Sequence, residues 1–196
     1  MTRSVGIFSV VKYKNLSFII MDCPTSRNCD AYITELQARN VKAVVRLCES
    51  TYSDEAVAAH GIAVHDLFVP DGGIPSDEII GSFLGLCTAQ FGALGDDTLG
   101  EPNHSVAVHC IAGLGRAPVM VCIALIEAGM DRIEAVEAVR KARRGALNSV
   151  QCRYLTDDYV VRCAKKSVGV KALFGKWKAA LPTNKVFQKK SPVVVA

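Results

Sequence analysis

Residues 109–118 read HCIAGLGRAP, and this short stretch decides how the rest of the chain is interpreted. Cys110 follows the apolar run SVAVH, and Arg116 stands six positions later at the start of a second apolar segment. Gly113 and Gly115 between them allow the backbone to turn its N–H groups inward. Such a concave loop at a helix N-terminus binds an anion and stabilises a thiolate. The alternative is a tight turn that happens to contain a cysteine.

The composition of this loop suits phosphate ester chemistry. Cys110 is the expected nucleophile, and the planar guanidinium of Arg116 matches two phosphate oxygens at once. The apolar strand pattern before the loop and the helix pattern after it favour a phosphate cradle over an accidental turn. We therefore predict that the substrate phosphate is bound by the loop residues Ile111, Ala112, Gly113, Leu114, Gly115 and Arg116.

The segments on either side predict an α/β fold with a central, mostly parallel twisted sheet flanked by helices. Residues 5–11 and 16–22 alternate as a hairpin with its turn near residues 14–15, and buried strands are expected at 41–48, 62–69 and 105–110. Helical periodicity and capping residues predict helices at 25–40, 53–61, 76–94, 116–129, 131–144 and 149–166. In the helix at 131–144, Ile133, Val136 and Val139 are expected on one face.

Reactive side chains follow three of the predicted strands. Cys48 ends residues 41–48, Asp71 follows residues 62–69, and Cys110 ends residues 105–110. Ligands of open parallel sheets bind beyond the carboxyl ends of the strands, so these side chains are expected around one crevice. Asp71 lies in the Gly-rich loop PDGGIP and is the candidate general acid. A turn-initiating role is the alternative for Asp71, and Asp66 is a competitor inside the strand pattern.

Three residues close to the loop in sequence or in the predicted fold bear on the mechanism. His109 and Cys48 each have two interpretations, and Ala117 has a kinetic consequence. His109 either orients the nucleophile or is a hydrogen-bonded core histidine. Cys48 either forms a reversible disulfide with Cys110 or is simply buried. Ala117 cannot donate a hydrogen bond to the departing thiolate, as Ser or Thr would, so the intermediate should form faster than it hydrolyses.

Cysteine and histidine usage predicts neither a metal nor a cofactor. Eight cysteines and four histidines are present without a CxxC pair or zinc-like spacing. The first residues lack the apolar run of a signal peptide, which predicts a cytoplasmic location with reduced thiols. No apolar segment reaches 18 residues, so no transmembrane helix is expected.

Charge is distributed unevenly along the chain. Residues 1–158 hold 14 basic and 19 acidic residues, whereas residues 159–196 hold nine basic and no acidic residues. We predict a domain at residues 1–166 and a basic extension at 167–196 with an amphipathic helix at 170–181. That helix either packs on its own domain or makes a weak, reversible contact with an anionic membrane, and a solvated, poorly ordered tail is a further alternative.

The stretch HCIAGLGRAPVMVCIALIEAGM closely resembles the signature of the phosphatases of regenerating liver, the type IVA protein tyrosine phosphatases. YKNLSFIIMDCPT, VVRLCESTY, DGGIPS and KARRGALNS also resemble that family, and the similarity spans roughly residues 13–159. It implies a cysteine-dependent phosphatase fold, with Cys110 as nucleophile, Arg116 as phosphate binder, Asp71 as general acid and Cys48 as disulfide partner. It further implies weak phosphatase activity and binding to the regulatory domain of a cyclin M type magnesium transporter, near Cys110, Asp71 and residues 143–144.

The chain departs from the family pattern in three places. Residues 67–70 read LFVP where the family usually has Trp-Pro-Phe-Asp before the acid, so loop closure is expected to differ. The chain ends in VVVA without a prenylation box, and its tail from about residue 165 is longer than the family's.

These observations predict a phosphatase acting on phosphorylated protein through a phosphocysteine intermediate. The apolar side chains of Ile111, Ala112 and Leu114 favour phosphotyrosine, with phosphoserine or phosphothreonine as an extension, over highly charged lipid headgroups. Two alternatives stay open: a phosphoinositide phosphatase, and a partner-binding module with weak catalysis. Nucleic acid is not an expected partner, and the sequence does not specify an oligomeric state.

Overall fold

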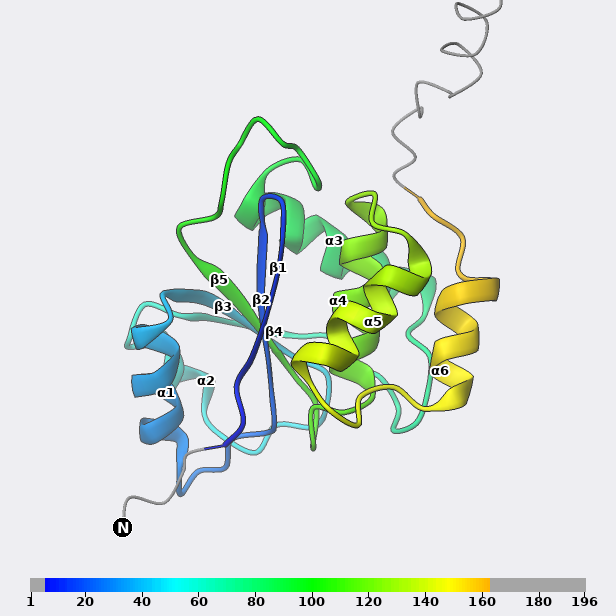
Figure 1. Ribbon diagram of the computed structural model, residues 1–196. Coiled ribbons are helices and arrows are strands. Elements are labelled where there is room, and N and C mark those ends of the chain that lie inside the picture. Colours follow the sequence, from blue (N-terminus) through cyan, green and yellow to red (C-terminus); the bar gives the residue numbers. More distant parts are fainter. Residues whose placement is uncertain (1–5, 163–196) are drawn as a thin grey trace, which may run out of the picture. The chain divides into compact units, whose positions relative to one another are not determined.

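A five-stranded sheet forms the centre of the computed structural model, which describes residues 6–162 (Figure 1). The strand order is β1-β2-β5-β3-β4. β1 pairs antiparallel with β2, and the pairs β2–β5, β5–β3 and β3–β4 are parallel, which confirms the mostly parallel sheet. The strands are β1 (Ser9–Tyr13), β2 (Leu16–Met21), β3 (Val41–Arg46), β4 (Ala63–Asp66) and β5 (Ser105–His109).

The opening hairpin has its predicted turn, although its first strand is Ser9–Tyr13 rather than residues 5–11. Lys14 at its turn has a φ of 49°, and Asn15 beside it is buried. The Asn15 side-chain amide donates to the Phe91 and Ala93 carbonyl oxygens at 2.9 and 2.8 Å. The turn is therefore fixed by the end of a helix nearly 80 residues away.

Helices cover both faces of the sheet (Figure 1). Alternate residues of β2 explain the two layers, because Ile19 and Met21 belong to one apolar cluster and Phe18 and Ile20 to another. α1 and α2 pack in the first cluster, and α3, α4 and α5 in the second. The helices are α1 (Cys29–Ala38), α2 (Asp54–Ala58), α3 (Asp77–Phe91), α4 (Arg116–Glu127), α5 (Arg132–Ala142), α6 (Ser149–Arg153) and the π-helix η1 (Tyr154–Asp158).

The central helix α4 is buried along its whole length. All of its residues, Arg116–Glu127, are buried. The helix packs against β2, β5, α3 and α5. Its apolar sequence VMVCIALI is therefore explained by contacts on all sides. A helix held this firmly fixes the position of the loop that precedes it.

Several element boundaries and one helix face differ from the sequence prediction. α1 begins at Cys29 rather than near residue 25, because Thr25 instead forms a turn in which its N–H and hydroxyl donate to Asn28 Oδ1. In α5 the buried residues are Ala135, Val136 and Val139, and Ile133 is 61% exposed.

The helix expected at residues 149–166 ends at Asp158. Glu127 at the end of α4 accepts hydrogen bonds from the Tyr159 hydroxyl and from the Arg162 backbone N–H, so the chain lies along α4 instead of continuing the helix. Within the described residues, no helix is long and apolar enough to cross a membrane. The whole basic extension predicted at 167–196, with its helix at 170–181, lies outside the described residues.

Candidate active site

A cavity of about 420 Å³ opens at the carboxyl ends of the parallel strands. It brings together the predicted Cys110, Arg116 and Asp71, whereas Gly113 is not among its lining residues. The described residues that line it are Asp71, Gly72, Cys110, Ile111, Ala112, Leu114, Gly115, Arg116, Gly145, Leu147, Asn148 and Gln151.

The two glycines of the loop differ in how tightly their surroundings constrain them. Gly113 has a φ of +66°, and a Cβ there would lie 2.3 Å from the Met21 carbonyl oxygen. Gly115 precedes the first residue of α4, and a Cβ there would lie 3.1 Å from Gln151 Nε2. A larger residue at position 113 would push the loop away from β2, whereas one at position 115 would require only a small shift of the Gln151 side chain. The loop is therefore a built structure rather than an incidental turn.

Arg116 reaches back from α4 into the cavity with a nearly buried side chain. Its Nη1 donates to the carbonyl oxygens of Leu47 and Val69 at 3.3 and 2.9 Å. Its Nη2 lies 3.0 Å from Asp71 Oδ1, and its buried Nε has no hydrogen-bond partner among the described residues. One nitrogen thus anchors the guanidinium to the scaffold, and the Nε–Nη2 edge is suited to two oxygens of an anion.

Asp71 lies at the mouth of the cavity on the loop after β4, with 90% of its side chain exposed. Its ion pair with Nη2 occupies part of the edge of Arg116 that would bind an anion. The exposed loop also contains Gly72 at a φ of 68°, so a change in its conformation meets little steric resistance. The predicted acid Asp71 is therefore one of the residues that line the cavity.

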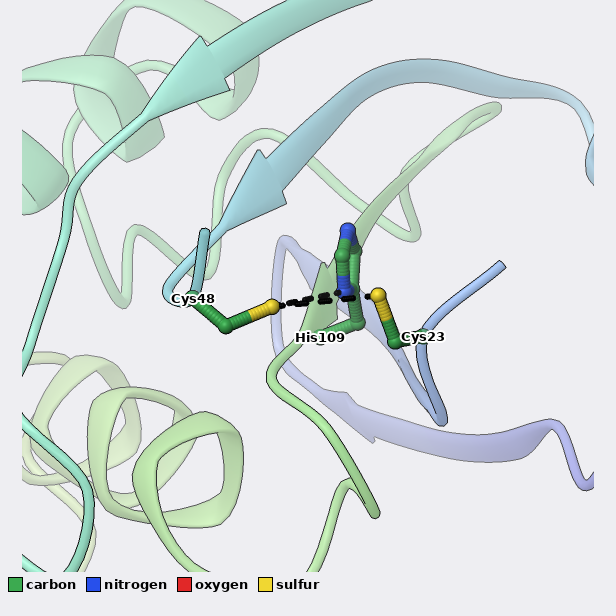
Figure 2. Close-up of side chains that lie close together, drawn as sticks. All are labelled: Cys23, Cys48 and His109. Atoms are coloured by element: carbon green, nitrogen blue, oxygen red, sulfur yellow. Dashed lines mark hydrogen bonds between the residues drawn. The ribbon is translucent and has the colours of Figure 1, made fainter. Parts of the chain in front are cut away.

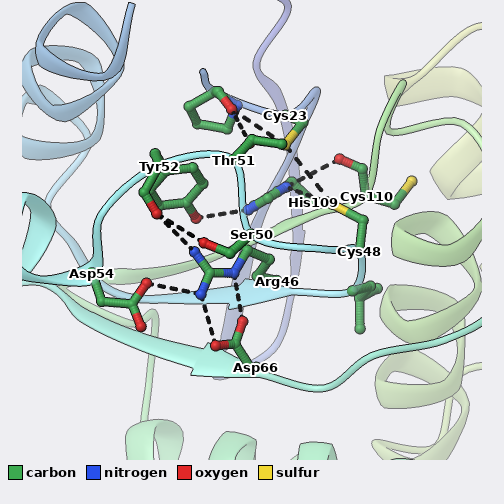
Figure 3. Close-up of polar contacts among 12 residues, drawn as sticks. Cys23, Arg46, Cys48, Ser50, Thr51, Tyr52, Asp54, Asp66, His109 and Cys110 are labelled. Carbon is green, nitrogen blue, oxygen red and sulfur yellow. Dashed lines mark hydrogen bonds and ion pairs between the residues drawn. The ribbon is translucent and has the colours of Figure 1, made fainter. Parts of the chain in front are cut away.

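Asp66, the competing acid, is engaged elsewhere. Both of its oxygens accept hydrogen bonds from Arg46, and Arg46 also pairs with Asp54 Oδ1 at 2.8 Å (Figure 3). The Arg46 guanidinium holds the pKa of Asp66 below its usual range. Asp66 therefore joins β4 to β3, and it is not among the cavity-lining residues.

His109 is a fully buried histidine with both ring nitrogens in hydrogen bonds. Its Nε2 lies 2.8 Å from the Tyr52 hydroxyl, and its Nδ1 lies 3.1 Å from the Cys110 carbonyl oxygen (Figure 3). Burial raises the pKa of Tyr52, which keeps its proton. His109 is therefore a hydrogen-bonded core histidine, as one interpretation predicted. Its bond to the Cys110 carbonyl also connects it to the backbone of the predicted nucleophile.

Arg143 is a site residue that the sequence did not single out for this position. Its buried side chain donates from Nε to the Gly113 carbonyl at 3.2 Å and from Nη2 to the Ala112 carbonyl at 2.8 Å. A third bond joins its Nη1 to the Ile7 carbonyl. Arg143 thus holds the loop in place through the carbonyls of two loop residues. Residues 143 and 144 were both expected near a partner, but Arg143 is buried and Arg144 is exposed. The hydrogen bond between Arg143 and Gly113 links residues 30 positions apart, so no local sequence pattern predicts it.

Gln151 is a second residue that the sequence analysis missed. It is buried, it lines the cavity, and its Oε1 accepts from the Asn148 N–H in a capping box at the start of α6. The Asn148-x-x-Gln151 spacing is a recognisable signal for a helix start, and the tertiary structure adds its place in the cavity.

The thiol of Cys48 is buried beside a cysteine that the sequence analysis did not consider. Cys48 Sγ lies 3.8 Å from Cys23 Sγ and 4.0 Å from His109 Nδ1 (Figure 2). The cysteines within residues 6–162 are all free thiols, so the predicted Cys48–Cys110 disulfide is absent from this structure. Cys110 itself is buried at the base of the cavity wall.

Comparison with known proteins identifies this arrangement. A family model described as "Polymorphic toxin system, DSP-PTPase phosphatase" matches residues 21–130. The chain is 41% identical over 147 residues to PRL-1 phosphatase of Drosophila melanogaster, covering 75% of this chain and 80% of that protein. It is 41% identical over 145 residues to human protein tyrosine phosphatase type IVA 3, covering 74% of this chain and 80% of that protein.

Solved structures share the fold. A structure from Leishmania major, named as a protein tyrosine phosphatase, is 32% identical with a TM-score of 0.68 and covers 79% of this chain and 99% of that chain. Kinase associated phosphatase is 17% identical with a TM-score of 0.63 over 78% of this chain and 93% of that chain, a likeness of fold alone. With the cavity and its cysteine loop, these similarities show that the chain belongs to the type IVA family of cysteine-dependent protein tyrosine phosphatases.

Proposed function

We propose that this phosphatase hydrolyses phosphotyrosine in proteins through a phosphocysteine intermediate on Cys110. The proposal rests mainly on the hydrogen bonding of Arg116. Its Nη1 donates to a backbone carbonyl, whereas its buried Nε has no partner among the described residues. A buried, unpaired N–H is costly, and an equatorial phosphate oxygen would satisfy it. The phosphorus atom would then be held within reach of the Cys110 sulfur in the same cavity.

In the first step the Cys110 thiolate attacks phosphorus and the bond to the phenolic oxygen breaks. Asp71 donates a proton to the leaving phenolate. Asp71 must first release Nη2 of Arg116, to which it is bound at 3.0 Å, because a phosphate dianion would compete for the same edge. Substrate binding would therefore free the carboxylate, which takes up a proton from solvent before it donates one to the leaving phenolate.

In the second step water attacks phosphorus, Asp71 accepts its proton, and the Cys110 thiolate leaves. Ala117 follows Arg116 in the first turn of α4 and is fully buried. Its methyl group cannot donate a hydrogen bond to the departing sulfur, so this step is expected to be slower than the first.

Ile111 and Leu114 support a phosphotyrosine substrate. These apolar side chains line the cavity and are 55% and 39% exposed. An aromatic ring can pack against them, whereas a headgroup with several phosphates would find apolar surface at those positions. Phosphoserine and phosphothreonine reach less far from their backbone and should be poorer substrates.

Rapid-mixing kinetics tests the intermediate. With a chromogenic aryl phosphate, we expect a burst of phenol release followed by a slower steady rate, and a mass increase of one phosphate in the quenched protein. Cys110→Ser should abolish both signals, and Cys152→Ser, which changes a half-buried cysteine outside the cavity, should leave them unchanged. A linear time course with no trapped adduct would contradict the proposal.

Substrate class is tested by a side-by-side assay. We expect a phosphotyrosine peptide to be hydrolysed with a higher kcat/KM than the matched phosphoserine peptide or phosphoinositides in mixed micelles. Faster release of phosphate from the phosphoinositides would instead favour the lipid phosphatase alternative.

A further inference from the structure

The cluster formed by Cys23, Cys48 and His109 lies beside the catalytic loop and has no role in the proposed hydrolysis (Figure 2). Cys23 follows β2, Cys48 follows β3, and His109 ends β5, the strand between them. Their donor atoms all lie within 4.8 Å of one another. Three neighbouring strand ends thus bring two thiols and an imidazole together.

Hydrogen bonding argues against a metal ion at this cluster. His109 Nδ1, the nitrogen that faces Cys48, also lies 3.1 Å from the Cys110 carbonyl oxygen. A carbonyl oxygen only accepts, so Nδ1 carries the proton and has no lone pair for a metal. The Tyr52 hydroxyl then donates to Nε2. Two thiols remain, fewer than the four ligands of a structural zinc site.

The two sulfurs are positioned for reaction with each other. They lie 3.8 Å apart, and the backbone N–H of Cys23 is fixed by a 2.8 Å hydrogen bond to the Ile111 carbonyl. Cys23 is partly exposed, whereas Cys48 is buried. An oxidant in solution therefore reaches Cys23 first, and Cys48 lies directly behind it.

Electrostatics distinguishes the roles of the two thiols. The hydrogen bond from Cys48 lowers the pKa of Cys23, with further contributions from His109 and Thr51, while burial opposes the shift. The same bond, followed by burial, raises the pKa of Cys48. Cys23 is thus the more acidic thiol of the pair, and its thiolate is the form that attacks oxidants.

We propose that Cys23 and Cys48 form a peroxide-sensitive thiol pair that closes to a disulfide. The Cys23 sulfur attacks a hydroperoxide, the O–O bond breaks, and Cys23 sulfenic acid and an alcohol or water are produced. Cys48 then attacks the Cys23 sulfur, the S–O bond breaks, and water leaves. The two thiols lose two electrons in total, and the hydroperoxide gains them.

Pairing with Cys23 removes Cys48 from any reaction with Cys110. The proposed disulfide and the Cys48–Cys110 disulfide predicted from the sequence share one sulfur, so each excludes the other. Cys110 therefore keeps its free sulfur in protein whose Cys48 is paired with Cys23.

Peptide mapping of the full-length protein tests this pair without reference to phosphatase turnover. The protein is treated with limiting hydrogen peroxide, alkylated, digested without reductant and analysed by mass spectrometry. We expect a peptide linking Cys23 to Cys48, with Cys110 alkylated. A wild-type map in which Cys48 is linked to Cys110, or in which Cys23 remains a free thiol, would overturn the proposal.

Variants sharpen the test. Cys23→Ser should lose the new disulfide and divert Cys48 to Cys110, and Cys152→Ser should give the wild-type map. If circular dichroism shows that Cys23→Ser is misfolded, the peptide map of the wild-type protein still tests the proposed disulfide. Native mass spectrometry with added Zn²⁺ should show no tightly bound ion. If the wild type binds one Zn²⁺ per chain and Cys23→Ser does not, the tautomer assigned to His109 is wrong and the cluster is a metal site.

Discussion

Arg116 shows how one side chain can serve both the fold and the chemistry. Its Nη1 joins two carbonyl oxygens from the segments after β3 and β4, so the cation is fixed before any substrate arrives. Such preorganisation removes the reorganisation that a flexible cation would require during the reaction. The same guanidinium binds Asp71, so the proposed binding of phosphate would release the acid.

Ala117 gives a kinetic prediction. Ala117→Ser should raise the steady-state rate and shrink the burst, because a hydroxyl at the first turn of α4 can hydrogen-bond to the departing Cys110 sulfur. Stopped-flow measurement of burst amplitude and steady rate checks this. An unchanged ratio of the two phases would show that thiolate departure does not limit turnover.

Arg143 should act as a positioning residue. Arg143→Leu removes the donors for the carbonyls of Ala112 and Gly113, and a displaced loop can lower kcat/KM by about 10²-fold. The fall should lie mainly in kcat if the loop is misaligned in the transition state. Arg143→Lys should restore part of the activity because it can bond to one carbonyl.

Arg144→Leu is the matched control, since Arg144 is the exposed neighbour. Its kcat/KM should equal that of the wild type. Equal losses in both variants would contradict the bracing role of Arg143.

The junction of β3 and β4 is stabilised by ionic contacts rather than by apolar side chains alone. Arg46 is 2% exposed, and it binds Asp66 on β4 and Asp54 on α2 (Figure 3). Its guanidinium also lies 4.9 Å from the centre of the Tyr52 ring, and Tyr52 in turn contacts His109. Three elements therefore converge on one buried cation behind the catalytic loop.

This junction should make stability depend on acid pH. Because Arg46 lowers the pKa of Asp66, the contribution of Asp66 is fully present above its unfolded pKa of about 3.9. It is lost as pH falls through the lower folded pKa. Urea unfolding at pH values from about 6 down to about 3 should show a decline that is smaller in Asp66→Asn.

Glu137→Gln on the exposed side of α5 is the control and should follow the wild-type pH profile, since it lies on a different element from Arg46. A wild-type slope in Asp66→Asn would show that other carboxyl groups cause the decline.

The predicted division of the chain at residue 166 gives a prediction for the whole protein. A chain ending at residue 166 should retain the unfolding temperature and phosphatase activity, because every cavity-lining residue lies before residue 152. It should lose binding to vesicles that contain phosphatidylserine, since six lysines lie beyond residue 166. Cosedimentation at low and high salt measures the binding.

The full-length chain should release these vesicles at high salt, where surface charge is screened. Equal vesicle binding by the two chains would contradict the membrane prediction, and loss of folding in the shorter chain would contradict the domain boundary.

Local sequence patterns were sufficient for most of the elements. Alternation placed the hairpin, Ser76 capped α3 through its bond from the Ile79 N–H, and the strand–loop–helix pattern located Cys110 and Arg116. These features depend on neighbouring residues, whose periodicity and hydrogen-bonding groups are visible in the chain itself. The start of α1 was misplaced because Thr25 forms a local turn with Asn28. The end of the last helix was misplaced because the distant contact of Tyr159 with Glu127 outweighed local propensity.

The sequence determined that a cysteine loop would meet an aspartate and an arginine at the strand ends, because each motif carries its own local signal. It did not indicate that Arg143 would brace that loop or that Cys23 would lie against Cys48. Those contacts exist because the order β2-β5-β3 sets three distant strand ends side by side, and because α5 ends at Arg143 next to the loop. Proximity across strands depends on packing of the whole sheet, so only the tertiary structure decided it.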